Sequence, residues 1–123
     1  MGTAVTKFIT KDSGKREEYV SGMRRDTQDG KPNFALILAE DMPYDIQPFT
    51  RLADLMTRGA DKYGERNWEK ANSIEELNRF KASAFRHFMQ WICGEDDEDH
   101  MAAVMFNLNA CEYVKYRMER GDK

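Results

Sequence analysis

The sequence lacks long hydrophobic runs and has few cysteines, and each shortage excludes a class of protein. No apolar segment approaches the roughly 18 to 20 residues that span a bilayer, and the first residues lack the apolar stretch of a secretory signal. Cys93 and Cys111 are too far apart to form the close pair of a zinc or redox motif. We therefore expect a cytoplasmic protein without a membrane partner, in which both cysteines are reduced.

Charge of one sign is also scarce. The chain has 19 Lys and Arg residues against 22 Asp and Glu residues, which gives a formal net charge of −3. This balance provides no broad attraction for a phosphate backbone, so we expect no nucleic-acid polymer as a partner. The length of 123 residues allows one domain with one core.

Glycine, proline and apolar residues are unevenly distributed along the chain. Residues 1–45 carry glycines and prolines among many charges, with one short apolar run at 34–38. We interpret this part as an N-terminal arm that is ordered around one short element and packs on the rest of the domain. Residues 46–123 have helical periodicity and are interpreted as a helical domain.

Three amphipathic helices are predicted in this second part. Apolar residues recur at helical spacing over 47–64. Ser73 and Glu76 have the spacing of a capping box, which predicts the start of a second helix that Gly94 ends. A third helix follows an acidic turn and extends to about Arg120. The expected fold class is all-α, a small antiparallel helical bundle with an N-terminal arm.

The apolar character of the last helix extends beyond what a small core needs. Tyr113, Tyr116 and Met118 lie near its end. These side chains favour a homo-oligomer, although they are equally consistent with covering the core of a monomer.

Both histidines are predicted to face the interior. His87 shares a helical face with Phe80 and Trp91, and His100 shares one with Ala103 and Asn107. Between the two helices lies the acidic run 95–99. Imidazole with carboxylate oxygens makes a reasonable first shell for Mg²⁺ or Mn²⁺. The alternative is a pair of hydrogen-bonded core histidines beside a solvated helix cap.

Two further segments have the chemistry of a phosphate site. The segment Lys62-Tyr63-Gly64-Glu65-Arg66-Asn67-Trp68 combines cations, an amide and two aromatic rings around a glycine turn, so it can bind phosphate oxygens and stack on a base. The alternative is a helix end packed by its aromatic residues. In the arm, Arg16 and Arg25 lie beside small residues, which is consistent either with a segment that folds over a triphosphate or with a disordered tail.

Together these segments resemble a family, the phage and prophage dATP/dGTP diphosphohydrolases, which are helical proteins related in style to MazG-like nucleotide pyrophosphohydrolases. The resemblance is nearly full length. It is carried by Asp12-Ser13-Gly14-Lys15-Arg16-Glu17, Arg25-Asp26-Thr27-Gln28, Gly30-Lys31, Gly59-Ala60, Lys62 to Trp68, Ser83, Arg86-His87, Gly94-Glu95, Asp99-His100, Ala103 and Asn107. It implies hydrolysis of a purine deoxynucleoside triphosphate to the monophosphate and pyrophosphate with a divalent metal, Mg²⁺ or Mn²⁺, which adjusts the phage nucleotide pool.

The chain departs from the MazG pattern at the metal site. MazG proteins hold their metals on a pair of helical Glu-x-x-Glu and Glu-x-x-Asp motifs, and Glu75 and Glu76 do not supply that pair. We expect the ligands instead at His87, Glu95, Asp99 and His100.

The expected mechanism needs one base and a set of substrate contacts, and it makes the helical domain 46–123 the expected catalytic domain. Glu95 or Asp96 is expected to take the proton from the attacking water. The substrate contacts are expected at Arg16, Arg25, Lys62, Tyr63, Arg66, Asn67, Trp68, Arg86 and Asn107, with the cations on phosphates and the aromatic rings on the base. Two alternatives stay open: an HD-type phosphohydrolase, whose adjacent His-Asp pair appears here only in reverse order, and a non-catalytic phage adaptor that binds a host protein.

Overall fold

A computed structural model describes residues 9–121. The chain divides into two compact units, one ending at Ile37 and the next beginning at Leu38. The sequence placed the corresponding division at residue 45.

The first unit contains a small β-hairpin and a short 3-10 helix. Strand β1 (Arg16–Glu18) pairs antiparallel with β2 (Arg24–Asp26), so that Glu17 lies opposite Arg25. The apolar run of the arm forms the 3-10 helix η1 (Phe34–Ile37). The hairpin was not predicted, because strands of three residues built mainly from Arg, Glu and Asp show no alternation of apolar and polar residues.

Hydrogen bonds to one carboxylate hold the base of the hairpin. The Ser13 hydroxyl donates to Asp26 Oδ1, and Lys31 Nζ lies 2.9 Å from Asp26 Oδ2. These two donors hold the pKa of Asp26 well below its usual range. The Asp26 carboxylate is therefore ionised at neutral pH. It links Ser13, which precedes β1, and Lys31, which follows β2, to the end of β2 itself.

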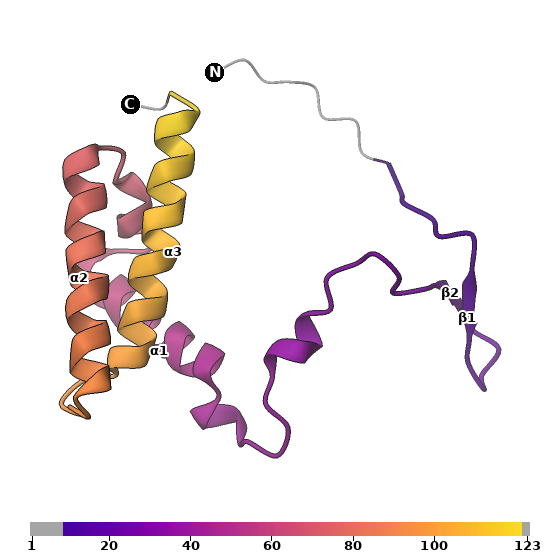
Figure 1. The fold of residues 1–123 in the computed structure, drawn as a ribbon. Coiled ribbons are helices and arrows are strands. Elements are labelled where there is room, and N and C mark those ends of the chain that lie inside the picture. The colour runs from indigo at the N-terminus through magenta and orange to yellow at the C-terminus, as the bar shows by residue number, and fades with distance from the viewer. Residues whose placement is uncertain (1–8, 122–123) are drawn as a thin grey trace. The chain divides into compact units, whose positions relative to one another are not determined.

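The second unit consists of three α-helices and two short 3-10 helices. Its elements in order are η2 (Tyr44–Ile46), α1 (Pro48–Tyr63), η3 (Asn67–Lys70), α2 (Ile74–Ile92) and α3 (His100–Glu119). Helices α2 and α3 pack against each other and run antiparallel, as Figure 1 shows, and α1 and η3 also pack on α3. The prediction of a small, mostly helical antiparallel bundle is confirmed.

The helix ends follow the signals read from the sequence. Pro48 occupies the first position of α1, and Gly64, with φ 95°, ends it in a conformation that favours glycine. The Ser73 hydroxyl accepts a hydrogen bond from the Glu76 amide at the start of α2. The Glu76 carboxylate in turn accepts from the Asn72 amide, at 3.0 Å.

Helix α3 is central to the core because small residues let its neighbours approach closely. Ala102 and Ala110 are fully buried, and the core around Leu77, Cys111 and Val114 is completed by Ala71 and Phe80. Several large apolar side chains of α2 remain exposed, among them Phe85 at 69% and Ile92 at 56%. Among residues 9–121 no helix is both long and apolar enough to cross a membrane.

Candidate functional site

A cavity of about 610 Å³ lies beside the turn that follows α1. We call it the Trp68 cavity. Its lining includes all five substrate residues that the sequence predicted in the segment 62–68. The complete lining is Leu55, Met56, Thr57, Gly59, Ala60, Lys62, Tyr63, Gly64, Glu65, Arg66, Asn67, Trp68, Glu98 and Phe106. The segment therefore combines with α1, α3 and the acidic turn to form one concave surface.

The two aromatic residues of this segment are placed differently. Trp68 is half-buried, and its ring makes edge contacts with Phe106 at 6.1 Å and with Tyr113 at 5.4 Å between centroids. Tyr63 is 62% exposed, and the Lys62 ammonium lies 5.2 Å from its ring centroid. Trp68 thus helps to hold the domain together, while Tyr63 offers the more accessible face to a base.

Arg66 is held at the edge of the cavity by the local backbone and by a carboxylate. It has a left-handed conformation with φ 57°, immediately before η3. Its guanidinium forms an ion pair with Glu69, three residues further on, and this pairing raises the pKa of Arg66. The adjacent Asn67 is exposed.

The two histidines meet at the end of the α2–α3 pair. His87 Nδ1 lies 2.8 Å from His100 Nδ1, and His100 Nε2 lies 2.7 Å from Asp97 Oδ1. Arg86 Nη2 is 3.3 Å from His87 Nε2. Both imidazoles are buried, at 7% and 2% exposure. The prediction that both histidines face the interior is confirmed.

The surroundings of these hydrogen-bonded side chains favour a neutral His87 and an ionised Asp97. Burial lowers the pKa of His87 most, the Arg86 charge acts in the same direction, and the Glu98 charge opposes both. The hydrogen bond from His100 lowers the pKa of Asp97. A neutral imidazole and an ionised carboxylate are the forms that bind metal ions.

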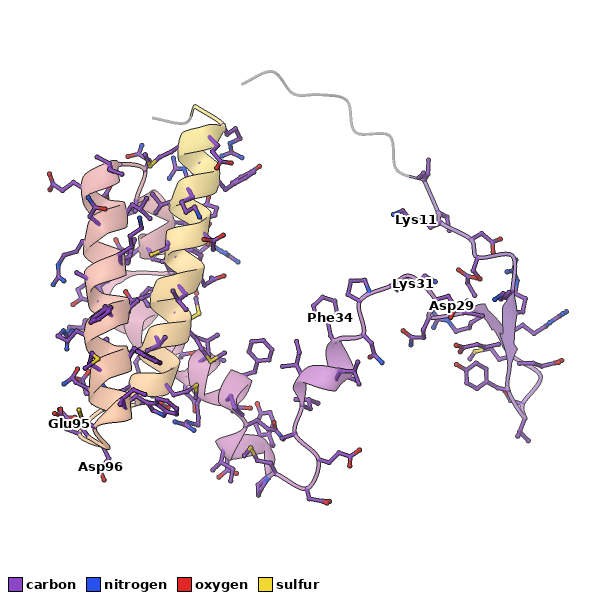
Figure 2. All side chains as sticks on the ribbon, viewed as in Figure 1. Lys11, Asp29, Lys31, Phe34, Glu95 and Asp96 are labelled. Carbon is purple, nitrogen blue, oxygen red and sulfur yellow. The ribbon has the colours of Figure 1, made fainter. Side chains whose placement is uncertain are left out.

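One group of three side chains among residues 9–121 has the geometry of a metal site. Glu95, Asp97 and His100 each offer a ligand atom, and these atoms lie within 4.8 Å of one another. Glu95 also accepts a hydrogen bond from Gln90 Nε2 at 3.0 Å. Figure 2 shows Glu95 and the exposed Asp96 in the turn between α2 and α3.

The structure does not bring Asp99 into this group. Both Asp99 oxygens bind the Arg51 guanidinium, at 2.8 and 2.7 Å, and Oδ1 also accepts from the Ala102 amide at the start of α3. The Arg51 hydrogen bonds lower the pKa of Asp99. The carboxylate that is hydrogen-bonded to His100 is that of Asp97. The ligand set read from the sequence omitted Asp97, although its spacing of three residues before His100 could have identified it.

The remaining predicted substrate residues lie in three different surroundings. Arg86 contacts His87 and also donates to Gln90 Oε1 at 3.0 Å. Asn107 is buried, and its amide donates to the Ala103 carbonyl of its own helix. Arg16 and Arg25 belong to the first unit: Arg16 is paired with Asp12 and Arg25 is exposed.

Glu98 connects the Trp68 cavity to the histidine and carboxylate group. It lines the cavity, it directly follows Asp97 in the chain, and its charge acts on His87. The cavity that carries the predicted phosphate and base contacts therefore adjoins the group that can hold a metal. Both features belong to the small, mostly helical second unit.

Comparison with known families identifies this domain more closely. A family model described as "dATP/dGTP diphosphohydrolase, N-terminal" matches residues 21–123, and the chain belongs to this family. The matched range contains β2, the Trp68 cavity and both histidines. No curated protein and no solved structure matches the chain.

Proposed function

We propose that this chain hydrolyses purine deoxynucleoside triphosphates, dGTP or dATP or both, to the monophosphate and pyrophosphate with the help of Mg²⁺ or Mn²⁺. Its role would be to adjust the nucleotide pool of a phage. The observation that carries the proposal is the position of Glu98, where the Trp68 cavity meets the Glu95–Asp97–His100 group inside the matched range.

The substrate would occupy the Trp68 cavity. A volume of about 610 Å³ lies within the range of roughly 300–1,000 Å³ that is typical of small-molecule sites. Lys62 and Arg66 would bind phosphate oxygens, and Arg86 would be available to a phosphate placed near the histidines. Tyr63 would contact the base, with the exposed part of Trp68 behind it.

The residues of the acidic turn fit a hard divalent cation. Glu95 and Asp97 supply carboxylate oxygens, and His100 supplies an imidazole nitrogen within 4.8 Å of them. We propose these three as ligands. His87 would orient His100 from behind, because its Nδ1 lies against His100 Nδ1. A bound cation would neutralise charge on the triphosphate and acidify a water molecule.

The reaction would be an attack of water on the α-phosphorus. The bond between the α-phosphorus and the bridging oxygen toward the β-phosphorus breaks, and pyrophosphate leaves with that oxygen. Glu95 or Asp96 would accept the proton of the attacking water. Lys62 and Arg66 would stabilise the charge that accumulates on the phosphate oxygens.

The test is incubation of the purified chain with each of the four common dNTPs and Mg²⁺ or Mn²⁺, with separation of products by ion exchange. We expect dGMP or dAMP together with pyrophosphate. Glu95→Gln should lower turnover by at least about a hundredfold, since general acid–base catalysis contributes about 10²–10⁴. Glu112→Gln is the matched control, because Glu112 is exposed and pairs only with Lys115 among the contacts found in residues 9–121.

Two outcomes would contradict the proposal. Intact triphosphates with both metals would support the non-catalytic adaptor instead. Release of inorganic triphosphate and a nucleoside would support the HD-type alternative, although Asp99 and His100 bind different partners here and do not form one shared site.

We also propose a homo-oligomer. The support is the exposed apolar surface of α2, which includes Phe85 and Ile92 on one helical face. Sedimentation velocity should give a mass that is a multiple of the 14.4 kDa chain, and Phe85→Asp should lower it. A single species at the chain mass would contradict this part of the proposal.

A further inference from the structure

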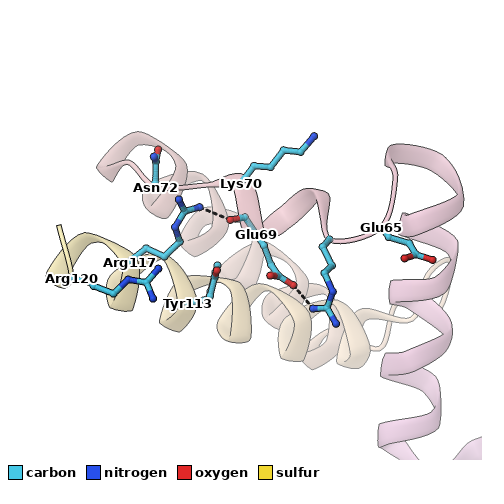
Figure 3. Close-up of a pocket in the computed structure, with 8 residues that line it drawn as sticks. Glu65, Glu69, Lys70, Asn72, Tyr113, Arg117 and Arg120 are labelled. Atoms are coloured by element: carbon cyan, nitrogen blue, oxygen red, sulfur yellow. Dashed lines mark hydrogen bonds and ion pairs between the residues drawn. The ribbon is translucent and has the colours of Figure 1, made fainter. Parts of the chain in front are cut away.

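A second cavity lies between η3 and the last turns of α3 (Figure 3). Its volume is about 630 Å³. We call it the Arg117 cavity. Its lining consists of Glu65, Arg66, Glu69, Lys70, Asn72, Tyr113, Arg117 and Arg120. Apart from Arg66, none of these residues belongs to the substrate set predicted from the sequence.

The charge of this cavity is opposite in sign to that of the whole chain. Its lining contains four cations and two carboxylates, whereas the chain carries a net charge of −3. One of the carboxylates, Glu69, is already paired with Arg66. The excess of positive charge among these lining residues attracts anions.

Two of the cations are fixed by the fold. Tyr113, Arg117 and Arg120 are spaced four and three residues apart, so they share one face of α3. Arg117 donates to the carbonyls of Glu69 and Ala71, which attaches it to η3 and to the residue after it. The Arg120 guanidinium lies 4.7 Å from the Tyr116 ring centroid. Because these guanidinium groups are held in place, binding a ligand orders little that is not already ordered.

The two cavities share a wall. Glu65 and Arg66 line both of them. Trp68 lines the first cavity and Tyr113 the second, and their rings are in edge contact at 5.4 Å. Arg66 therefore borders both cavities.

We propose that the Arg117 cavity is a separate binding site for a polyphosphate anion, either pyrophosphate or the phosphate chain of a nucleotide. Lys70, Arg117 and Arg120 supply charge-assisted donors to the phosphate oxygens, and Arg66 supplies a further cation at the shared wall. Occupation of this site withdraws Arg66 from the Trp68 cavity, so it weakens the binding of a triphosphate there. The site does not depend on hydrolysis in the Trp68 cavity.

The test is calorimetric titration of the full chain with inorganic pyrophosphate in the presence of EDTA, which removes divalent metals. Arg120→Ala and Lys70→Ala should each weaken binding by about tenfold, the usual effect of losing one charge-assisted contact. Arg79→Ala removes an exposed cation on α2 that lines neither cavity, and it should change the affinity by less than about twofold. Circular dichroism of each variant verifies that the fold is intact.

Each outcome separates the possibilities. Failure of pyrophosphate to bind, or binding that Lys62→Ala abolishes and Arg120→Ala leaves unchanged, would overturn the proposal. Repeating the titration with dATP identifies the source of the phosphates: a loss in Arg120→Ala with dATP supports a nucleotide site, and a loss with pyrophosphate alone supports a site for the free anion. The titration measures binding and not turnover, so it tests this site separately from the proposed hydrolysis. A chain that hydrolyses no dNTP but binds pyrophosphate through Arg120 would contradict the hydrolysis and support this site.

Discussion

His87 Nδ1 lies 2.8 Å from His100 Nδ1, a hydrogen bond between two buried imidazoles. Only one of the two nitrogens can carry the proton, because two N–H groups facing each other would repel. The neighbours decide which. Arg86 can only donate to His87 Nε2, so in the metal-free protein His87 carries its proton on Nδ1, and His100 then donates from Nε2 to Asp97. A cation bound at His100 Nε2 would require His100 to carry its proton on Nδ1 instead.

The first prediction concerns these tautomers. Long-range ¹H–¹⁵N correlation spectra of the metal-free protein should show His87 protonated at Nδ1 and His100 at Nε2. His87→Ala should lower the free energy of unfolding by about 1–3 kcal/mol, because His100 Nδ1 loses its donor in a buried position. Urea denaturation measures this change. The reverse pair of tautomers would contradict the hydrogen-bond chain.

The second prediction concerns the ion pair that joins α1 to the start of α3. Asp99→Asn keeps a helix cap but loses the charge that binds Arg51, so it should cost about 0.5–1 kcal/mol, as expected for a pair that is partly exposed. Asp99→Ala also loses the acceptor of the Ala102 amide and should cost about 1 kcal/mol more.

A double-mutant cycle of Arg51→Ala with Asp99→Asn should give a coupling energy close to the cost of the single change at Asp99. Turnover measured on the folded Asp99→Asn variant separates the two roles considered for this residue. Activity within about threefold of the parent supports a structural role. A loss of turnover as large as that caused by Asp97→Asn would support Asp99 as a metal ligand.

The third prediction uses the two tryptophans of the chain as reporters. Trp91 is 52% exposed on α2, so Trp91→Phe should leave the fold intact and Trp68 as the single emitter. Adding dATP should change the fluorescence of Trp68, because this residue lines the proposed substrate cavity. Lys62→Ala should shift the titration midpoint upward by about tenfold. An unchanged emission at saturating dATP would place the substrate elsewhere.

The fourth prediction concerns the pH dependence of the α2 cap. The Ser73 hydroxyl and the Asn72 amide lower the pKa of Glu76. Its contribution to stability is therefore complete above the pKa of an unfolded Glu, about 4.3, and is lost as the pH falls through the lower pKa of the folded state. The stability difference between the parent and Glu76→Gln should disappear in this acidic range.

Ser73→Ala provides the complementary measurement. It removes both the acceptor of the Glu76 amide and the donor to the Glu76 carboxylate, so it should cost about 0.5–2 kcal/mol at neutral pH. Thermal or urea unfolding at pH 7 and at pH 3 measures both effects. A difference between parent and Glu76→Gln that does not shrink as the pH falls below about 4.3 would contradict the role of the carboxylate.

The sequence by itself determined the helices and their ends, because these depend on neighbours within a few residues. Apolar periodicity gave α1, α2 and α3, and the signals at Gly64 and Ser73 set two of their boundaries. The same local reasoning grouped Lys62 to Trp68 as one segment and placed His87 and His100 on inward faces. It missed the hairpin, since Arg16–Glu18 and Arg24–Asp26 have too little apolar pattern to predict strands.

Only the tertiary structure decided which side chains meet, because contacts between helices depend on packing distances that spacing along the chain does not contain. Asp97 and Asp99 lie two residues apart and have the same chemistry, yet one binds His100 and the other binds Arg51, which is 48 residues away. Trp68 packs on Tyr113 for the same reason, and the two cavities that these residues line form only once η3 has docked on α3.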